Sequence, residues 1–308
     1  SQEDLAAFGY AWGSETEDLN ELIHKAEQVM YAQRRKYAMR GDGRPRRPGR
    51  PDYLDGLLRE FRQSNFVVYL QPLYGVEQGA VIGAEALVRK IDEEGNVHAP
   101  FEFVHMMEEE NLISVVDYEM LEQSCRLLKE VGEHWPGFQL SCNMSRNTLA
   151  ELDYLDRIDD ILTRTGVDHS QLIFEVTESS RGLQLESIED RLNALKARGI
   201  AVAVDDMGTE CSCLEMLYLP QLDLVKIDRS LISKTGHGPR EQAVIGSLID
   251  LCHKLGLGCI AEGIETKEQG ELLKSLGCDR LQGYYFGRPM PPQEFFARFG
   301  PGAQEHQT

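Results

Sequence analysis

The sequence predicts an α/β fold, a modified TIM (β/α)8 barrel with its first strand antiparallel, preceded by an N-terminal helical segment. Eight short β-rich runs recur along the chain, and amphipathic helix patterns such as 116–131 and 188–198 lie in most of the intervals between them. This alternation favours a closed, mostly parallel barrel. The first interval, PLYGVEQGA, is too short for a crossover helix, so we expect the first two strands to pair as an antiparallel hairpin.

The predicted elements follow in order from the N-terminus. Apolar residues at helical spacing predict an amphipathic helix over 18–40, and a run rich in Arg, Pro and Gly predicts a linker over 41–52. The barrel is expected over 53–300, followed by a tail over 301–308. The eight predicted strands are Phe66–Gln71, Val81–Arg89, Phe138–Asn143, Leu172–Thr177, Ala201–Asp205, Leu222–Ile227, Gly258–Gly263 and Arg280–Tyr285.

Composition limits the class of partner. A formal net charge of −19 argues against a nucleic acid polymer, because phosphate backbones bind clustered Lys and Arg. The negative charge still allows a small phosphodiester ligand if acidic side chains hold divalent cations, because the cations make the local electrostatic potential positive. No run of the sequence is apolar enough to span a membrane, and seven cysteines, an odd number, argue against a disulfide framework. We therefore expect a cytoplasmic segment with no membrane span of its own.

Polar residues lie in or at the ends of seven predicted strands, where barrels of this kind gather their reacting groups. Ile173 and Glu175 share one strand face, as do Ala203 and Asp205, so these acids can point into the barrel. The polar residues are Glu85, Asn143, Glu175, Asp205, Asp206, Lys226, Asp228, Glu262 and Gln282. We expect all of them to face one opening.

Several carboxylates in one barrel mouth would repel one another unless cations neutralise them, and oxygen ligands favour Mg²⁺ or Mn²⁺. A divalent metal site is therefore the simplest single explanation. Simpler explanations exist for the residues taken separately. They are a helix cap at Asp205 and Asp206, a surface ion pair of Lys226 with Asp228, and solvated loop acids at Glu262 and Glu265.

A set of short motifs resembles the EAL-domain family, whose members hydrolyse cyclic di-GMP. The signature is Glu85-Ala86-Leu87, followed by Arg89. The other family-like blocks follow in the family's order: Gln71-Pro72, Asn143-Met144-Ser145, Glu175-Val176-Thr177-Glu178, Asp205-Asp206, Lys226-Ile227-Asp228, Ala261-Glu262-Gly263-Ile264-Glu265-Thr266 and Gln282-Gly283. The resemblance covers roughly residues 57–299 and implies the same modified barrel as the strand pattern.

The resemblance implies a phosphodiesterase that uses two divalent cations, Mg²⁺ or Mn²⁺, to convert cyclic di-GMP into linear pGpG, with Ca²⁺ as an inhibitor. The implied ligands of the first cation are Glu85, Asn143, Glu175 and Asp205, which bridges to a second cation held by Asp206 and Glu262. In the same resemblance, Lys226 orients the attacking water, and Glu265 and Gln282 support ligands or waters. Glu178 is implied to brace the loop after Asp206. The implied substrate contacts are Gln71, Leu87, Arg89, Asp228, Gly263 and Gln282.

The loop after the two aspartates departs from the family pattern. It reads DDMGTECSCL over 205–214, where the family reads DDFGTGYSSL. Glu210 replaces a family glycine and would be strained if that position needs a positive φ. A second interpretation is therefore a receptor that binds cyclic di-GMP with little or no turnover. A third, a barrel hydrolase of another phosphodiester, leaves Gln71 and Arg89 unexplained.

Cysteine and histidine give no separate metal signal. Cys211 and Cys213 have no second pair at a zinc-ribbon spacing, so we expect them to be ordinary free thiols. His105 and His253 lie in helical patterns and are interpreted as packing or surface residues.

The N-terminal helix contains AEQVMY over 26–31 and a basic end, which resembles the last helix of a GGDEF diguanylate cyclase domain. Residues 1–40 are therefore interpreted as the C-terminal remnant of such a domain in a longer parent protein. That parent could be attached to a membrane through its other N-terminal domains. We expect no synthesis of cyclic di-GMP, because the cyclase loop is absent from the sequence. An unrelated amphipathic helix is the alternative. Family dimers predict a homodimer.

Overall fold

The computed structural model describes residues 65–109, 112–177, 185–208, 216–233 and 238–303. The predicted helix over 18–40 and the linker over 41–52 lie outside these ranges, as do Glu178 and the altered loop residues 209–215.

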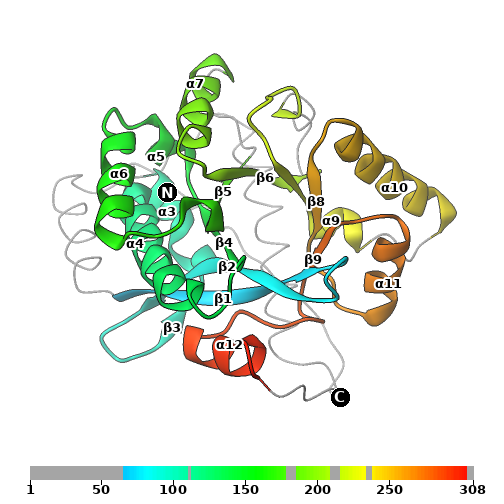
Figure 1. Cartoon of the computed structure of the whole chain (residues 1–308), viewed down its shortest axis with the longest axis horizontal. Helices are drawn as coiled ribbons and strands as arrows, with labels where there is room; N and C mark the ends of the chain where they lie inside the picture. The colour runs from blue at the N-terminus through cyan, green and yellow to red at the C-terminus, as the bar shows by residue number, and fades with distance from the viewer. Residues whose placement is uncertain (1–64, 110–111, 178–184, 209–215, 234–237, 304–308) are drawn as a thin grey trace, which may run out of the picture. The chain divides into compact units, whose positions relative to one another are not determined.

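Eight strands close into a barrel (Figure 1). Around the ring the strands follow the order β1, β2, β4, β5, β6, β7, β8, β9. β1 pairs antiparallel with both of its neighbours, β2 and β9, and all other neighbouring strands pair in parallel. The short β3 pairs with β2 outside the ring. The strands are β1 Asn65–Gly75, β2 Ala80–Ile91, β3 Val97–His98, β4 Gln139–Asn143, β5 Leu172–Thr177, β6 Ala201–Met207, β7 Leu224–Ile227, β8 Gly258–Ala261 and β9 Arg280–Gln282. The predicted modified TIM barrel with an antiparallel first strand is confirmed.

Two predicted strands were too long at their C-terminal ends, and glycines explain both. β8 ends at Ala261 because Gly263 has φ 68°, where a side chain would also collide with Arg229. β9 ends at Gln282 because the backbone at Gly283 passes against the backbone of Ile264, leaving no room for a Cβ. The amide of Ile264 donates to the carbonyl of Gln282 at 3.1 Å, so the loop after β8 is bonded to the end of β9.

Helices surround the ring (Figure 1). The predicted helices over 116–131 and 188–198 are α4 and α7, with slightly different bounds. None of the helices in the described ranges is both long and apolar enough to cross a membrane. The helices are η1 Pro100–Glu102, α3 Val104–Glu109, α4 Ile113–Gly132, α5 Arg146–Ala150, α6 Tyr154–Thr165, η2 His169–Gln171, α7 Leu185–Lys196, α9 Arg229–Ile232, α10 Pro239–Lys254, α11 Lys267–Ser275 and α12 Pro292–Phe299.

An apolar layer fills the barrel interior below the mouth. It consists of five buried residues from five strands, and burial of each Leu or Ile side chain stabilises the fold by about 1.5–3 kcal/mol. The layer residues are Leu73, Ile173, Ala203, Leu224 and Ile260. Because strand side chains alternate between two faces, the inward residues of the next layer follow two positions along each strand. The apolar layer is therefore the floor of whatever site lies at the mouth.

Candidate active site

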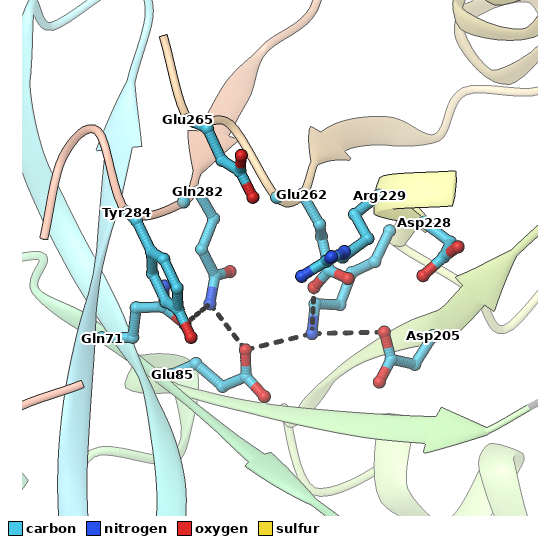
Figure 2. A pocket seen from close by; sticks show the side chains of 12 residues that line it. Gln71, Glu85, Asp205, Asp228, Arg229, Glu262, Glu265, Gln282 and Tyr284 are labelled. Carbon is cyan, nitrogen blue, oxygen red and sulfur yellow. Dashed lines mark hydrogen bonds and ion pairs between the residues drawn. The ribbon is translucent and has the colours of Figure 1, made fainter. Parts of the chain in front are cut away.

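The candidate site lies directly above this floor. Each of four floor residues on parallel strands is followed two positions later by a charged residue, and on the antiparallel β1 Gln71 lies two positions before Leu73. The four charged residues are Glu175, Asp205, Lys226 and Glu262. Asp205, Lys226 and Glu262 line a pocket of about 220 Å³ with polar walls (Figure 2), and Glu175 lies beneath it in contact with Lys226. The two-residue alternation of strand side chains, which predicted that these acids face inward, therefore explains why they meet at the barrel mouth.

Lys226 occupies the centre of the site. It lies on β7 and is only 1% exposed. Its Nζ contacts four carboxylates from four different strands or strand ends, and the contacts with Glu85, Asp205 and Glu262 are drawn in Figure 2. The distances are 2.6 Å to Glu175, 2.7 Å to Glu262, 3.2 Å to Asp205 and 3.3 Å to Glu85. A surface ion pair of Lys226 is therefore the wrong interpretation, because one buried ammonium is shared by four carboxyl groups.

Amide side chains hold Glu85 in place. Gln282 Nε2 donates to Glu85 Oε2 at 2.6 Å, and Asn143 Nδ2 donates to Glu85 Oε1 at 3.1 Å. Gln282 also donates to Gln71 Oε1 at 3.2 Å. The hydrogen bonds of Gln282 on β9 therefore join it to β1 through Gln71 and to β2 through Glu85. Asn143 lies beside Glu175 in the register of β4 and β5. The predicted ligands Glu85, Asn143, Glu175 and Asp205 are thus neighbours.

Burial and crowding change the pKa values of the cluster. Burial and the nearby Glu85 hold the pKa of Glu175 well above its ordinary value. Burial, with repulsion from Asp205 and Glu85, raises the pKa of Glu262 to about 8. Burial disfavours charge on Lys226 too, but the surrounding carboxylates hold its pKa well above the ordinary lysine value. For Glu85, burial is outweighed by Lys226 and by hydrogen bonds from Gln282 and Asn143, so its pKa is lowered. The cluster thus combines a permanent cation with carboxylates that retain protons.

Binding of a divalent cation to this cluster should release protons. Burial and Asp205 raise the pKa of Asp206 to about 6, and that of Glu262 is about 8, so a cation must displace protons at lower pH. We expect Mg²⁺ affinity to increase from about pH 6 to about pH 8. Calorimetric titrations at both pH values, in buffers of different ionisation enthalpy, measure the protons released. Binding at pH 6 without proton release would contradict this prediction.

The backbone is distorted where the two aspartates meet. The pairing of β6 with β7 shifts register between Val204 and Met207, a bulge of the kind that redirects side chains near active sites. Asp206 has φ 60°, the only non-glycine residue with positive φ in the described ranges, a conformation that costs of order 1–3 kcal/mol. As a result, carboxylate oxygens of Asp205, Asp206 and Glu262 lie within 4.8 Å of one another. The pair lies in β6 and not at a helix start, so the helix-cap explanation is wrong.

Three further predicted residues line the pocket rim: Asp228, Gly263 and Glu265. Asp228 also caps α9, because its Oδ1 accepts from the amide of Ser230 at 2.8 Å. Leu87 and Arg89 lie further along β2, on the same strand face as Glu85 and beyond the pocket lining. The Arg89 guanidinium lies 5.4 Å from the centre of the Tyr69 ring and donates to the carbonyl of Val88 at 2.8 Å.

Three lining residues were not predicted as site residues, Arg229, Gly283 and Tyr284. Arg229 directly follows Asp228, and Tyr284 follows Gln282 by two positions, so proximity to predicted site residues was the available signal. The Arg288 guanidinium lies 4.2 Å from the centre of the half-exposed Tyr284 ring. A cationic and an aromatic side chain thus extend the polar pocket toward solvent.

A buried carboxylate supports the segment that carries Asn143. Asp117 on α4 accepts from the Ser145 amide at 2.9 Å and from the Thr148 hydroxyl at 2.5 Å. Ser145 in turn caps α5, because its side chain accepts from the amide of Thr148. Burial raises the pKa of Asp117 to about 6 despite these hydrogen bonds. This carboxylate therefore positions the turn after β4 without touching the pocket.

Replacing Asp117 by alanine should destabilise the fold by about 1–3 kcal/mol, because the buried Thr148 hydroxyl and the partly buried Ser145 amide lose their acceptor. Asparagine keeps an acceptor and should cost less. The folded pKa of Asp117, about 6, exceeds the unfolded value, so its stabilising contribution is complete below about pH 4 and is lost as the pH rises through about 6. Urea unfolding at several pH values measures this. An unchanged pH slope in Asp117→Asn would refute the assignment.

Comparisons with known proteins agree on one family. The EAL domain profile matches residues 55–289. Signaling protein YkoW of Bacillus subtilis is 31% identical over 280 residues, covering 89% of this chain and 35% of YkoW. Cyclic di-GMP phosphodiesterase RocR of Pseudomonas aeruginosa is 31% identical over 239 residues, covering 78% of this chain and 61% of RocR. The chain thus spans about a third of one curated relative and less than two thirds of the other.

Solved structures give the same result. The PaMucR phosphodiesterase in its c-di-GMP complex has a TM-score of 0.71 and 31% identity, covering 79% of this chain and 98% of that one. An EAL domain protein from Listeria monocytogenes EGD-e has a TM-score of 0.69 and 26% identity, covering 83% of this chain and 99% of that one.

Proposed function

The chain belongs to the EAL-domain family, and on that premise we propose that it hydrolyses cyclic di-GMP to linear pGpG with two divalent cations. The observation that supports this most is the convergence of four buried carboxylates on one ammonium at the barrel mouth. Without cations, the cluster must either leave negative charges uncompensated in a buried position or keep protons on buried carboxylates, and both are costly. Cations that bind there during function remove this cost.

The chemistry of the donor set fits Mg²⁺ or Mn²⁺, because all donors are carboxylate or amide oxygens. We assign Glu85, Asn143, Glu175 and Asp205 to the first cation and Asp206 with Glu262 to the second, supported by Glu265. When bound, such cations lower the pKa of water and stabilise charge on phosphoryl oxygens. Ca²⁺ fits the same donors and is proposed to inhibit, since it accepts more ligands in a looser geometry.

The chain's own groups orient the reaction. Lys226 keeps its proton because its pKa is raised, so it acts as a hydrogen-bond donor and fixed positive charge toward the water and the phosphoryl oxygens, not as a base. Gln71, Leu87, Arg89, Asp228, Gly263 and Gln282 are proposed to contact the dinucleotide. A water oxygen bonds to phosphorus, the bond from phosphorus to the 3′ oxygen breaks, one proton ends on that oxygen, and the other ionises from the new 5′ phosphate.

Other features stay proposals. A homodimer and an upstream GGDEF-like or sensor domain follow from the family resemblance, as do the bracing role of Glu178 and the domain bounds. A cytoplasmic location follows from the cysteine content alone.

The experiment that tests the function is chromatographic product analysis. The purified chain is incubated with cyclic di-GMP in Mg²⁺, in Mn²⁺, in Ca²⁺ and with chelator, and binding is measured in parallel. We expect pGpG in Mg²⁺ or Mn²⁺, and binding without product in Ca²⁺. Binding without product in every metal would instead support the receptor, an outcome that the sequence of the loop over 209–214 keeps open.

A further inference from the structure

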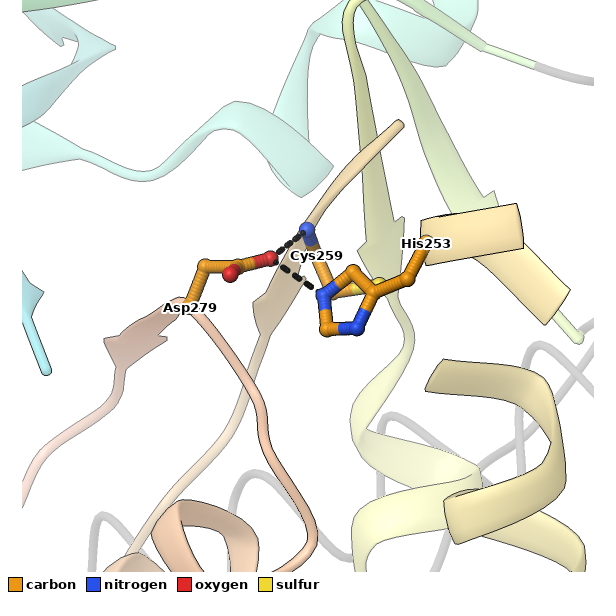
Figure 3. Close-up of side chains that lie close together, drawn as sticks. All are labelled: His253, Cys259 and Asp279. Carbon is orange, nitrogen blue, oxygen red and sulfur yellow. Dashed lines mark hydrogen bonds and ion pairs between the residues drawn. The ribbon is translucent and has the colours of Figure 1, made fainter. Parts of the chain in front are cut away.

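A second cluster of metal-binding side chain types lies at the opposite end of the barrel strands from the mouth. Cys259 is the second residue of β8, Asp279 directly precedes β9, and His253 is in the last turn of α10. One ligand atom from each lies within 4.8 Å of those of the other two (Figure 3). The proposed active-site residues of the same two strands, Glu262 and Gln282, lie by contrast at or directly beyond the C-terminal ends of β8 and β9. The two clusters therefore share no residue.

The three side chains are held in a defined arrangement. Asp279 Oδ2 lies 2.9 Å from His253 Nε2 and accepts from the Cys259 amide at 2.7 Å. His253 and Asp279 point toward one another beside Cys259 (Figure 3). Ile260 faces the barrel interior, so Cys259 faces outward. There its thiol lies against α10, where it donates to the carbonyl of Ile249 at 4.0 Å.

Access differs among the three residues in a way that suits metal entry. The side chains of His253 and Asp279 are 40% and 44% exposed, whereas Cys259 is fully buried. A cation can therefore arrive from solvent at the imidazole and carboxylate and reach the thiol below them. A simple exposed ion pair between His253 and Asp279 would contribute at most about 1 kcal/mol and would not require a thiol at its base.

The ligand chemistry differs from that of the barrel mouth. Imidazole nitrogen, thiolate sulfur and carboxylate oxygen together favour Zn²⁺ and related ions such as Co²⁺, whereas an all-oxygen set favours Mg²⁺, Mn²⁺ and Ca²⁺. Three protein ligands leave a fourth tetrahedral position for water.

We propose that His253, Cys259 and Asp279 form a second, zinc-type metal site at the end of the barrel opposite the catalytic mouth. A metal there ties α10 to the starts of β8 and β9 and stabilises the folded state without taking part in hydrolysis. On binding, the Cys259 thiol gives up its proton to solvent and its sulfur bonds to the metal as thiolate.

The test uses Co²⁺ as an optical probe on the whole chain, with excess Mg²⁺ present and a reductant that contains no thiol. Coordination by thiolate gives a sulfur-to-cobalt absorption band that oxygen ligands do not give. We expect this band in the unmodified chain and its loss on addition of Zn²⁺. Cys259→Ser should abolish the band, and His253→Ala should weaken Co²⁺ binding by more than about 10-fold.

Two control variants separate this site from other thiols. Cys278→Ser removes a buried thiol that donates to the Cys259 carbonyl and should keep the band. A Cys211→Ser, Cys213→Ser double variant should keep it as well. Thermal melting with Mg²⁺ checks that each variant folds, independently of any hydrolysis. No band in the unmodified chain, or an undiminished band in folded Cys259→Ser, would overturn the proposal.

Discussion

Lys226→Met should reduce hydrolysis of cyclic di-GMP by about 10²–10³-fold, the typical cost of removing one donor that stabilises developing charge. The same change should destabilise the cation-free fold by about 3–5 kcal/mol, because it leaves four buried carboxylates without their ammonium. Mg²⁺ should restore part of that stability, since the cations replace the lost positive charge. Turnover rates and thermal melting in Mg²⁺ and in chelator measure both effects.

The matched control is Lys254→Met. Lys254 pairs with Asp250 at 2.5 Å, but both side chains are mostly exposed, so its loss should cost well under 1 kcal/mol and leave turnover unchanged. If Lys226→Met hydrolyses the substrate at the unmodified rate, Lys226 has no catalytic role. If its melting temperature in chelator is also unchanged, the carboxylates do not depend on it.

Glu85→Gln should reduce both cation affinity and turnover, each by about 10²-fold or more. The substitution preserves side-chain size but removes one charge, and its new amide donor faces the donating groups of Gln282 and Asn143. In the unmodified chain, a cation at 100 times its Kd stabilises the fold by about 2.7 kcal/mol. That gain should largely disappear in the variant.

Melting with and without Mg²⁺ checks this directly, with Glu94→Gln on the exposed turn after β2 as the control. A Glu85→Gln protein with normal turnover and a normal Mg²⁺-dependent stabilisation would remove Glu85 from the metal ligands.

The barrel could be predicted from the sequence because the patterns that indicate it, strand periodicity and the lengths of the intervals between strands, lie within short segments of the chain. The short interval before Val81 predicted the reversed first strand, and two-residue periodicity predicted that Glu175 and Asp205 face inward. Strand ends were less predictable, because the turns at Gly263 and Gly283 depend on contacts with distant segments.

The parts of the site that the sequence did not predict depend on tertiary contacts. The central position of Lys226 on β7 requires four other strands to bring their carboxylates to it, and the left-handed conformation of Asp206 arises from a bulge against β7. His253 was interpreted as a packing or surface residue, because its contact with Asp279 joins positions 26 residues apart. Asp117 likewise acts on a turn 28 residues away.

Anomalous diffraction from crystals grown with Mn²⁺ and pGpG tests whether the acidic cluster holds two catalytic cations. We expect two Mn²⁺ peaks, one bonded to Glu85, Asn143, Glu175 and Asp205 and the other to Asp206 and Glu262, with Lys226 displaced from the centre of the carboxylates. Bound nucleotide with no Mn²⁺ peak, and Lys226 still held by all four carboxylates, would contradict this prediction.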